Sequence, residues 1–462
     1  VGSLTIPAMI RVGYKREFAG AVEAAASTGG QITPPVMGAA AFLMVEFLNI
    51  SYQSILAAAA VPAFMHFFGV FMQVHFVAKR DGLRGLTPQE MPRLRESFRM
   101  RWPTLVPLVL MIWILVSGRT PYLAAFTGIV SCMIVGLTMP TVGVGVVNAI
   151  SFVGFHLLLI AMAFLDWGMQ ADEIKLSLFL AGVLVWWLMK RFAGLKGRID
   201  VSVLAEAFET GAKYALAVGA AAATVGIVIG VVTLTGVGFK ISFIVTSWAQ
   251  AIAGWAMIWL PAALADLHSL TLLAALFMTG VVCILMGCGI PTTANYIIMV
   301  TVAAPTLVQL GVEPLVAHFF VFYYGVLADI TPPVALAAYA AAGMAGGDPF
   351  KTGTQAFKLG LAKALVPFVF VFSPSLLLVT KGFNWNDFVI TLAGCIVGIV
   401  VLAAALSNYF ITHMKRWESL ICILAALLLI APGTQSGLLG LALLVPVLFN
   451  QWRAAASGSR LT

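Results

Sequence analysis

The sequence predicts an all-α protein that crosses a membrane many times, and its composition and the character of its apolar runs carry the prediction. Of its 462 residues, 61% are hydrophobic and 10% are charged, whereas a soluble globular domain is typically about 45–50% apolar and about 25% charged. At least ten stretches approach the roughly 20 apolar residues that a spanning helix needs. These runs are continuous, whereas a transmembrane β-barrel alternates apolar and polar residues. We therefore expect a polytopic transmembrane helical bundle.

Clusters of Lys and Arg predict which loops face the cytoplasm, because cytoplasmic loops carry an excess of these residues. The basic segments are Lys79–Arg101, 190–198 and 415–416. The first of them holds seven basic and three acidic residues, a net charge of 7 − 3 = +4. The acidic segment Asp166–Glu173 and the segment Asn384–Asp387 are expected on the outer side. Since the basic residues gather at span ends, the net charge of +8 indicates topology and not a nucleic-acid partner.

An internal repeat is the most informative feature of the sequence. Ile32–Val36, which reads Ile-Thr-Pro-Pro-Val, recurs as Ile330–Val334 at an offset of 298. The same offset pairs Pro7 with Pro305, Gly13 with Gly311, Ala19 with Ala317 and Ala39 with Ala337, and after a short insertion Val61-Pro62 corresponds to Val366-Pro367. Alanine-rich helices can resemble one another by chance, but five consecutive identities that include Pro-Pro favour a duplicated membrane unit.

The Thr-Pro-Pro segments predict a broken helix in each repeat. Proline removes a backbone donor and clashes with the preceding turn, and it pushes the residue before it out of the helical region. The freed carbonyl groups must be buried or line a polar cavity, and duplicated transporters use such breaks as binding sites at the repeat interface. Ser27–Gln31 adds flexible backbone and oxygen ligands of the kind that sodium prefers. The alternative is a hinge without a ligand.

A further segment, Gly287–Tyr296, reads Gly-Cys-Gly-Ile-Pro-Thr-Thr-Ala-Asn-Tyr within a long apolar region. Two glycines, a proline and several polar side chains predict the tip of a hairpin that enters the membrane and turns back. The alternative is an ordinary loop between two spans. The absence of flanking charges favours the buried hairpin.

Asp329 is an acidic residue in a predicted span, and Gln31 stands at the equivalent position of the first repeat. A carboxylate in a span costs about 2.5–3.5 kcal/mol on insertion scales and is usually functional, although Asp329 could instead cap a helix end. The candidate ion- or substrate-binding residues are Ser27, Thr28, Gly29, Gly30, Thr33, Pro34, Gly287, Gly289, Thr292, Thr293, Asn295, Asp329, Thr331 and Pro332, with Thr33, Asp329 and Thr331 as sodium ligands. Asp329 would also suit coupling to protons, and no cofactor is expected.

At these residues the chain resembles a known family, the large permease subunit of the tripartite ATP-independent periplasmic (TRAP) transporters. It is most similar to the fused permeases that work with TAXI-type binding proteins. The passages that carry the resemblance are Gly13-Tyr14, Glu17–Ala19, Glu23–Pro35, Leu234–Gly238, Gly287–Tyr296 and Ala317–Tyr339. The resemblance implies inverted repeats, two re-entrant helical hairpins, an elevator-type movement and Na+- or H+-driven uptake of organic carboxylates. It also implies a periplasmic substrate-binding protein and a location in the bacterial or archaeal inner membrane.

The repeat also predicts how the chain is organised and what accompanies it. Subtracting 298 from Gly287–Tyr296 places the first-repeat counterpart of this hairpin before residue 1. We therefore expect an upstream permease part that carries this hairpin, and the resemblance to the fused permeases implies that the small-subunit helices lie there too. The predicted divisions are 1–78 (remainder of the first repeat), 79–101 (basic cytoplasmic loop), 102–240 (connecting and scaffold spans), 241–382 (second repeat) and 383–462 (extra C-terminal spans).

Three other classes of protein remain as alternatives. An intramembrane enzyme would need a catalytic constellation, and the six histidines are scattered without ligand spacing, so no enzyme activity is expected. An ion channel could share a duplicated broken-helix core, and conductance above carrier turnover would reveal it. A secondary carrier from another inverted-repeat family would work without a binding protein.

Overall fold

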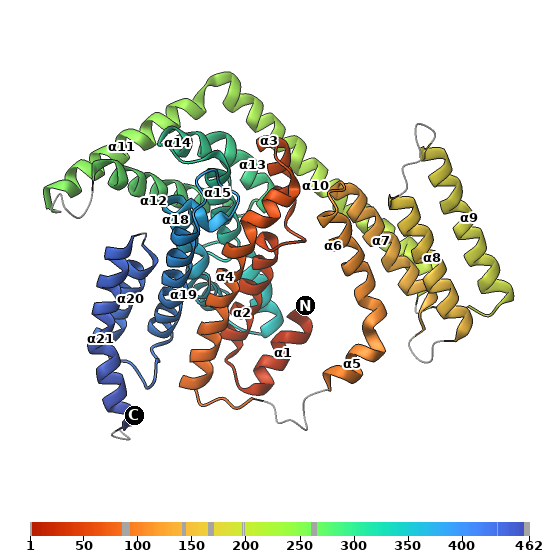
Figure 1. The fold of residues 1–462 in the computed structure, drawn as a ribbon, viewed down its shortest axis with the longest axis horizontal. Coiled ribbons are helices and arrows are strands. Elements are labelled where there is room, and N and C mark those ends of the chain that lie inside the picture. The colour runs from red at the N-terminus through yellow and green to blue at the C-terminus, as the bar shows by residue number, and fades with distance from the viewer. Residues whose placement is uncertain are drawn as a thin grey trace. The chain divides into compact units, whose positions relative to one another are not determined.

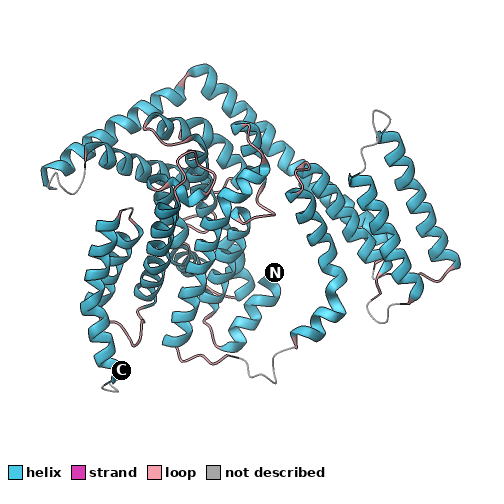
Figure 2. Ribbon diagram, in the orientation of Figure 1, coloured by secondary structure: helices cyan, strands magenta, loops and turns pink. Residues whose placement is uncertain are grey.

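The structure is a computed structural model, and it describes residues 2–85, 93–140, 145–164, 171–195, 197, 199–259, 266–431 and 433–456. Within these ranges the regular structure is helical, with one isolated β-bridge between Tyr409 and His413 and no strand (Figure 2). Eight of the described helices are long and apolar enough to cross a membrane. The prediction of an all-α, multi-pass membrane protein is therefore confirmed.

The chain forms two compact units, each described here by itself (Figure 1). Unit 1 comprises Val1–Leu86 and Ala221–Thr462, and unit 2 comprises Thr87–Ala220. The helices of unit 1 are α1 (Gly2–Val12), α2 (Arg16–Gly29), η1 (Gly30–Ile32), α3 (Ala39–Leu48), α4 (Tyr52–Arg80), α11 (Val237–Trp259), α12 (Leu267–Gly287), α13 (Thr292–Val302), α14 (Ala304–Gln309), α15 (Pro314–Ala328), α16 (Leu336–Ala345), α17 (Pro349–Leu359), α18 (Leu361–Phe372), η3 (Pro374–Leu377), α19 (Trp385–Ser407), α20 (Arg416–Ile430) and α21 (Thr434–Ala456).

Unit 2 contains the helices of the middle of the chain. They are α5 (Leu94–Arg101), η2 (Trp102–Leu105), α6 (Val106–Val116), α7 (Pro121–Thr138), α8 (Val146–Phe164), α9 (Ala171–Phe192) and the first part of α10 (Val201–Thr235). The basic segment predicted as a loop is helical over α5, since Leu94–Arg101 has no proline and good helix formers. The predicted outer segment at 166–170, the residues 86–92, and Lys196 and Arg198 lie outside the described residues.

Several helix starts follow from local side-chain chemistry. Ser51, Asp266 and Asp348 each precede a helix, and each side chain accepts a hydrogen bond from a backbone N–H of the first turn. These contacts satisfy donors that a helix cannot pair internally. Hydrogen bonds from the Ser269 side chain and backbone lower the pKa of the Asp266 carboxyl, which keeps this cap ionised and acceptor-only.

The repeat in the sequence has a counterpart in the helices. The first repeat runs through α2, a non-helical break and α3, and the second runs through α15, a break and α16. α2 ends at Gly29 and α15 at Ala328, within one residue of the 298-residue offset. Both repeats continue into helices with an internal proline, Pro62 in α4 and Pro367 in α18. The duplication therefore extends from sequence to secondary structure.

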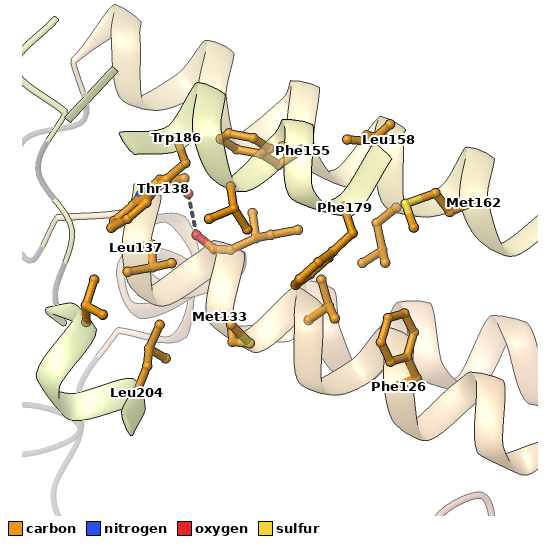
Figure 3. A pocket seen from close by; sticks show the side chains of 16 residues that line it. Phe126, Met133, Leu137, Thr138, Phe155, Leu158, Met162, Phe179, Trp186 and Leu204 are labelled. Carbon is orange, nitrogen blue, oxygen red and sulfur yellow. Dashed lines mark hydrogen bonds between the residues drawn. The ribbon is translucent and has the colours of Figure 1, made fainter. Parts of the chain in front are cut away.

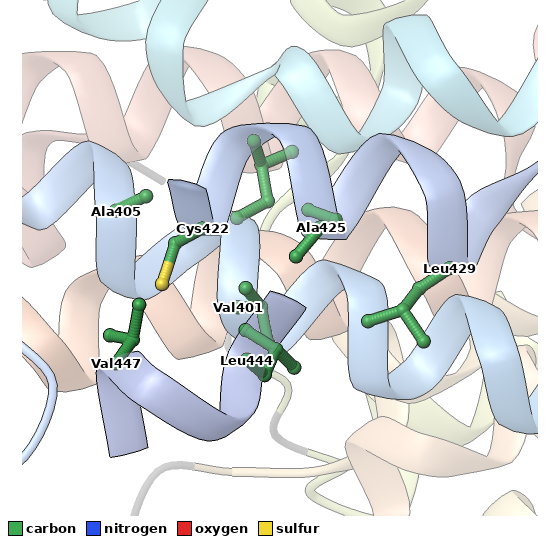
Figure 4. Packing of buried hydrophobic residues seen from close by; sticks show 9 residues of the cluster. Val401, Ala405, Cys422, Ala425, Leu429, Leu444 and Val447 are labelled. Carbon is green, nitrogen blue, oxygen red and sulfur yellow. The ribbon is translucent and has the colours of Figure 1, made fainter. Parts of the chain in front are cut away.

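The last three helices form a tightly packed layer of α19, α20 and α21 (Figure 4). Small residues allow this packing: a Cβ on Gly394 would lie 2.6 Å from the Leu429 carbonyl oxygen. Close backbone approach of this kind is how helices associate in lipid, where burial against water offers no drive. α20 has 15 residues and α21 has 23, and α21 is among the candidate spans.

Candidate functional site

Both Thr-Pro-Pro segments lie between helices and not inside one. In the first repeat the chain leaves helical geometry at Thr33 and resumes it at Ala39. In the second it leaves after Ala328 and resumes at Leu336. The peptide bond between the two prolines is cis in both breaks. The two breaks therefore share one backbone design.

The two break threonines make the same hydrogen bond. Thr33 Oγ1 donates to the Gly29 carbonyl oxygen at 2.6 Å, and Thr331 Oγ1 donates to the Leu327 carbonyl oxygen at 2.7 Å. Each hydroxyl donates its hydrogen bond to the carbonyl oxygen four residues earlier. It thereby satisfies a carbonyl that has no backbone donor because the helix is broken. The hydroxyl oxygen keeps lone pairs that can accept. Both threonines are half-buried, and each offers an oxygen ligand beside its break.

Asp329 joins three predicted parts of the site. Gln31 Nε2 donates to Asp329 Oδ2 at 3.3 Å, and Thr292 Oγ1 donates to the same oxygen at 3.0 Å. Gln31 and Asp329 are equivalent positions of the repeat, so the two breaks meet through this pair. Thr292 stands at the start of α13, so the segment between α12 and α13 reaches the same carboxylate.

The segment between α12 and α13 is a short turn that returns the chain on itself. Gly289 has φ +80°, a left-handed conformation that glycine adopts without a Cβ penalty. The side chain of Asn295 is fully buried, and a Cβ on Gly287 would lie 2.4 Å from its Nδ2. That Nδ2 donates to the Cys283 carbonyl oxygen at 3.3 Å, while Asn295 Oδ1 has no partner among the described residues. An unpaired buried acceptor is costly, so this oxygen is suited to a ligand. Thr293 is half-buried and stands two residues before Asn295.

The residues just before the first break divide into two groups. The exposed Ser27 donates its hydroxyl proton to Glu23 Oε1 at 2.9 Å, and Glu23 also accepts from Thr5. The side chain of Ser27 is therefore engaged with Glu23, away from the contacts that join the two breaks. Thr28, by contrast, is buried and bonded to Lys363. Gly29 packs against the His66 ring, while Gly30 and the half-buried Pro34 lie at the turn itself.

Three buried polar residues of this region are absent from the candidate binding residues that the sequence predicted. Lys363 and His66 are fully buried, and Glu23 is 8% exposed. Lys363 stands within an apolar run of the sequence. A charged residue in such a run is itself a signal of function, so the sequence did contain a clue to this residue. Pro332, one of the predicted site residues, is half-buried within the second break.

A separate apolar cavity lies within unit 2, among α7, α8, α9 and the start of α10 (Figure 3). Its labelled lining includes Phe126, Phe155, Phe179 and Trp186. The hydroxyl of Thr138 in this lining donates to the Ile134 carbonyl oxygen at 2.6 Å. With so few polar groups, this cavity suits an apolar group and not a carboxylate.

Comparison with known proteins adds two matches. A family model described as "Tripartite ATP-independent periplasmic transporter, DctM component" matches residues 1–385. A second model, a domain of unknown function (DUF3394), matches residues 388–440. No curated protein matches the chain. The first match includes both breaks and the turn between α12 and α13, and the second covers most of α19 and all of α20.

Proposed function

Because the chain belongs to the DctM family of tripartite ATP-independent periplasmic transporters, we propose that it performs ion-coupled uptake of organic carboxylates as the membrane permease of such a system. It is a multi-pass membrane transporter and not an enzyme family member. The family in general works with a periplasmic binding protein and a small membrane subunit. Our proposal gives this chain a TAXI-type binding protein and a place in the inner membrane.

The observation that best supports the proposal is the contact between the two breaks. Gln31 and Asp329 are 298 residues apart and occupy equivalent repeat positions, yet their side chains are hydrogen-bonded at 3.3 Å. Duplicated transporters bind substrate and coupling ion where their repeats meet at broken helices. The Asp329 carboxylate also accepts from Thr292 at this interface, and Thr33 and Thr331 stand two residues after Gln31 and Asp329 in the sequence.

These groups suit a small hard cation. The proposed sodium ligands are the oxygens of Thr33, Thr331 and Asp329, aided by backbone oxygens of the two breaks. The alternative coupling ion is a proton carried on Asp329. Either ion would offset the charge of the half-buried carboxylate, which is costly when unpaired.

The proposed movement is of the elevator type. Both breaks, the α12–α13 turn and Lys363 all belong to unit 1. A rigid-body movement of the helices that carry them would therefore move the whole site across the membrane without dismantling it. The spans of residues 102–240 would act as the scaffold in this scheme.

Reconstituted transport tests the proposal directly. The permease, assembled with its small-subunit helices in proteoliposomes, should take up a radiolabelled carboxylate only when its binding protein and an inward Na+ or H+ gradient are both present. Uptake that needs no binding protein would identify a carrier of another kind. Conductance far above carrier turnover would identify a channel.

A further inference from the structure

Lys363 is a lysine with no contact to solvent. It lies near the start of α18, and its side chain is 0% exposed. Among the described residues, the partner of its Nζ is Thr28 Oγ1, at 3.1 Å. An ammonium group offers three donors, and its removal from water costs several kcal/mol unless other charges or dipoles compensate. The buried ammonium group of Lys363 therefore needs acceptors and opposite charges around it, and the surrounding residues supply them.

The surroundings of Lys363 form a connected set of acceptors. Thr28 Oγ1 donates to the carbonyl oxygens of Ala24 and Ala25, at 3.0 and 3.2 Å, so its lone pairs face the ammonium donor. The Ala25 carbonyl also accepts from His66 Nε2 at 3.1 Å. His66 Nδ1 is then an acceptor, and it is buried without a partner among the described residues. These carbonyls belong to the last turns of α2, the end of a helix at which the dipole favours a cation.

Charge interactions point the same way. The opposite charges of Lys363 and Asp329, at the second break, attract each other, whereas a protonated His66 of α4 would be repelled by Lys363. Asp329 therefore adds an attractive charge to the oxygen acceptors around the ammonium group.

The repeat shows that this positive charge is specific to one side. Val61-Pro62 corresponds to Val366-Pro367, an offset of 366 − 61 = 305. In that register Lys363 corresponds to Ala58, since 363 − 305 = 58, and Ala58 is a fully buried apolar residue of α4. Lys363 of the second repeat thus places a positive charge at the end of α2, whereas the equivalent residue of the first repeat, Ala58, has no charge.

We propose that the Lys363 ammonium is the built-in cation of the first break, occupying the acceptors that a bound metal ion would otherwise take there. This inference rests on the proposed function, because it assigns the ions of the same site. The first break then binds no Na+, which narrows the proposed sodium ligands to Asp329 and Thr331 at the second break and removes Thr33 from them. The two matched breaks become one fixed and one exchangeable cation site.

Replacement of the lysine tests the assignment without any substrate. Lys363→Met removes the charge at similar length, and Lys358→Met is the matched control because Lys358 is exposed on the neighbouring helix α17. In the purified permease with its partner subunits, Na+ should raise the Tm of Lys363→Met above the rise seen in wild type. The expected extra rise is about 2–3 °C when NaCl replaces choline chloride. Lys358→Met should behave as wild type.

Two further variants and one measurement keep the test decisive. Lys363→Gln should gain the same Na+ response, and Lys363→Arg, which keeps a cation, should not. Equal Na+ shifts in wild type, Lys363→Met and Lys363→Gln would overturn the proposal. If neither neutral variant folds, radioactive Na+ binding to the wild type decides, because at most one Na+ per chain is expected and two or more would overturn it.

These readouts separate the inference from the proposed function. Thermal shifts and Na+ binding require neither a carboxylate nor a binding protein, so they remain valid if uptake fails. Conversely, binding-protein-dependent uptake together with two bound Na+ would sustain the proposed function and refute the assignment of Lys363.

Discussion

The two Thr-Pro-Pro breaks share a backbone and differ in their charges. Each has a cis peptide bond between its prolines and a threonine bonded to the carbonyl four residues earlier. At the first break the repeat position holds the neutral Gln31, and Lys363 approaches the end of α2. At the second, the equivalent position holds Asp329. Duplication has conserved the geometry of the breaks, while divergence at a few side chains has placed opposite charges beside them.

This difference has an energetic reason. A single buried charge costs several kcal/mol, but a buried pair of opposite sign loses much of that penalty through mutual attraction and hydrogen bonds. A symmetric site with two carboxylates would repel itself unless a cation were always bound. The difference in charge between the two breaks therefore allows a carboxylate for ligand binding, while the site without a bound ion avoids most of the cost of an unpaired charge.

The largest expected effect comes from erasing the asymmetry at the second break. Asp329→Asn removes the negative charge of the carboxylate that accepts hydrogen bonds from Gln31 and Thr292. The half-saturation concentration of the coupling ion should therefore rise about 100-fold. That corresponds to about 3 kcal/mol, the upper range for a hydrogen-bonded charge. The measurement is uptake against Na+ concentration and against pH at equal membrane expression.

Asp348→Asn is the control for that experiment, since Asp348 is exposed and asparagine keeps its role as a helix cap. Addition of Gln31→Glu to Asp329→Asn returns a carboxylate to the pair and should recover part of the loss. Unchanged half-saturation for both ions in Asp329→Asn would show that the carboxylate serves only as a helix cap.

The break threonines should respond unequally if the two breaks bind different cations. Thr331→Val keeps the side-chain shape and removes an oxygen ligand of the exchangeable site, so cation affinity should fall about 10-fold or more. Thr33→Val removes the matched hydroxyl at the break that holds Lys363, and its effect should be smaller. Equal losses in both variants would indicate two equivalent ion sites.

A stability comparison probes the packing of the first break. A Cβ on Gly29 would lie 2.6 Å from the His66 ring, whereas a Cβ on Gly30 meets nothing within 4 Å. Gly29→Ala should therefore lower the free energy of unfolding by about 1–3 kcal/mol, and Gly30→Ala should change it by less than about 0.5 kcal/mol. Thermal unfolding of the two purified variants measures the difference, and equal Tm values would mean that the His66 ring can move aside freely.

The smallest expected effect concerns topology and leaves transport unaltered. The basic segment that begins at the end of α4 contains Ser97, and the exposed Asn386 lies just after the second repeat, beyond α18. If the repeats are inverted, these positions lie on opposite sides of the membrane, with Ser97 in the cytoplasm. Ser97→Cys and Asn386→Cys in a background without other reactive cysteines should differ in labelling by a membrane-impermeant reagent in intact cells. Labelling of Ser97→Cys from outside would reverse the proposed orientation.

Much of the fold was predictable because its causes are local. The excess of apolar residues specifies a membrane helix wherever a run is long enough, and Thr-Pro-Pro interrupts a helix in either repeat through its own sterics. The basic segment at Leu94–Arg101 was predicted as a loop, and it folds as α5 because its propensity is helical. The sequence also singled out Asp329 as a candidate, since a carboxylate in an apolar run is itself a signal of function.

The contacts that give the site its chemistry were decided by the tertiary structure alone. Gln31 and Asp329 are 298 residues apart, and Thr28 and Lys363 are 335 apart. The sequence marked the equivalence of the first pair, but equivalence does not imply contact. Whether a lysine near the start of an apolar helix reaches water or turns inward depends on the helices packed around it. Burial and pairing are properties of the assembled bundle, because the dielectric surroundings of each charge are set by residues remote in the chain, while helix formation and helix breaking are set by neighbours within a few residues.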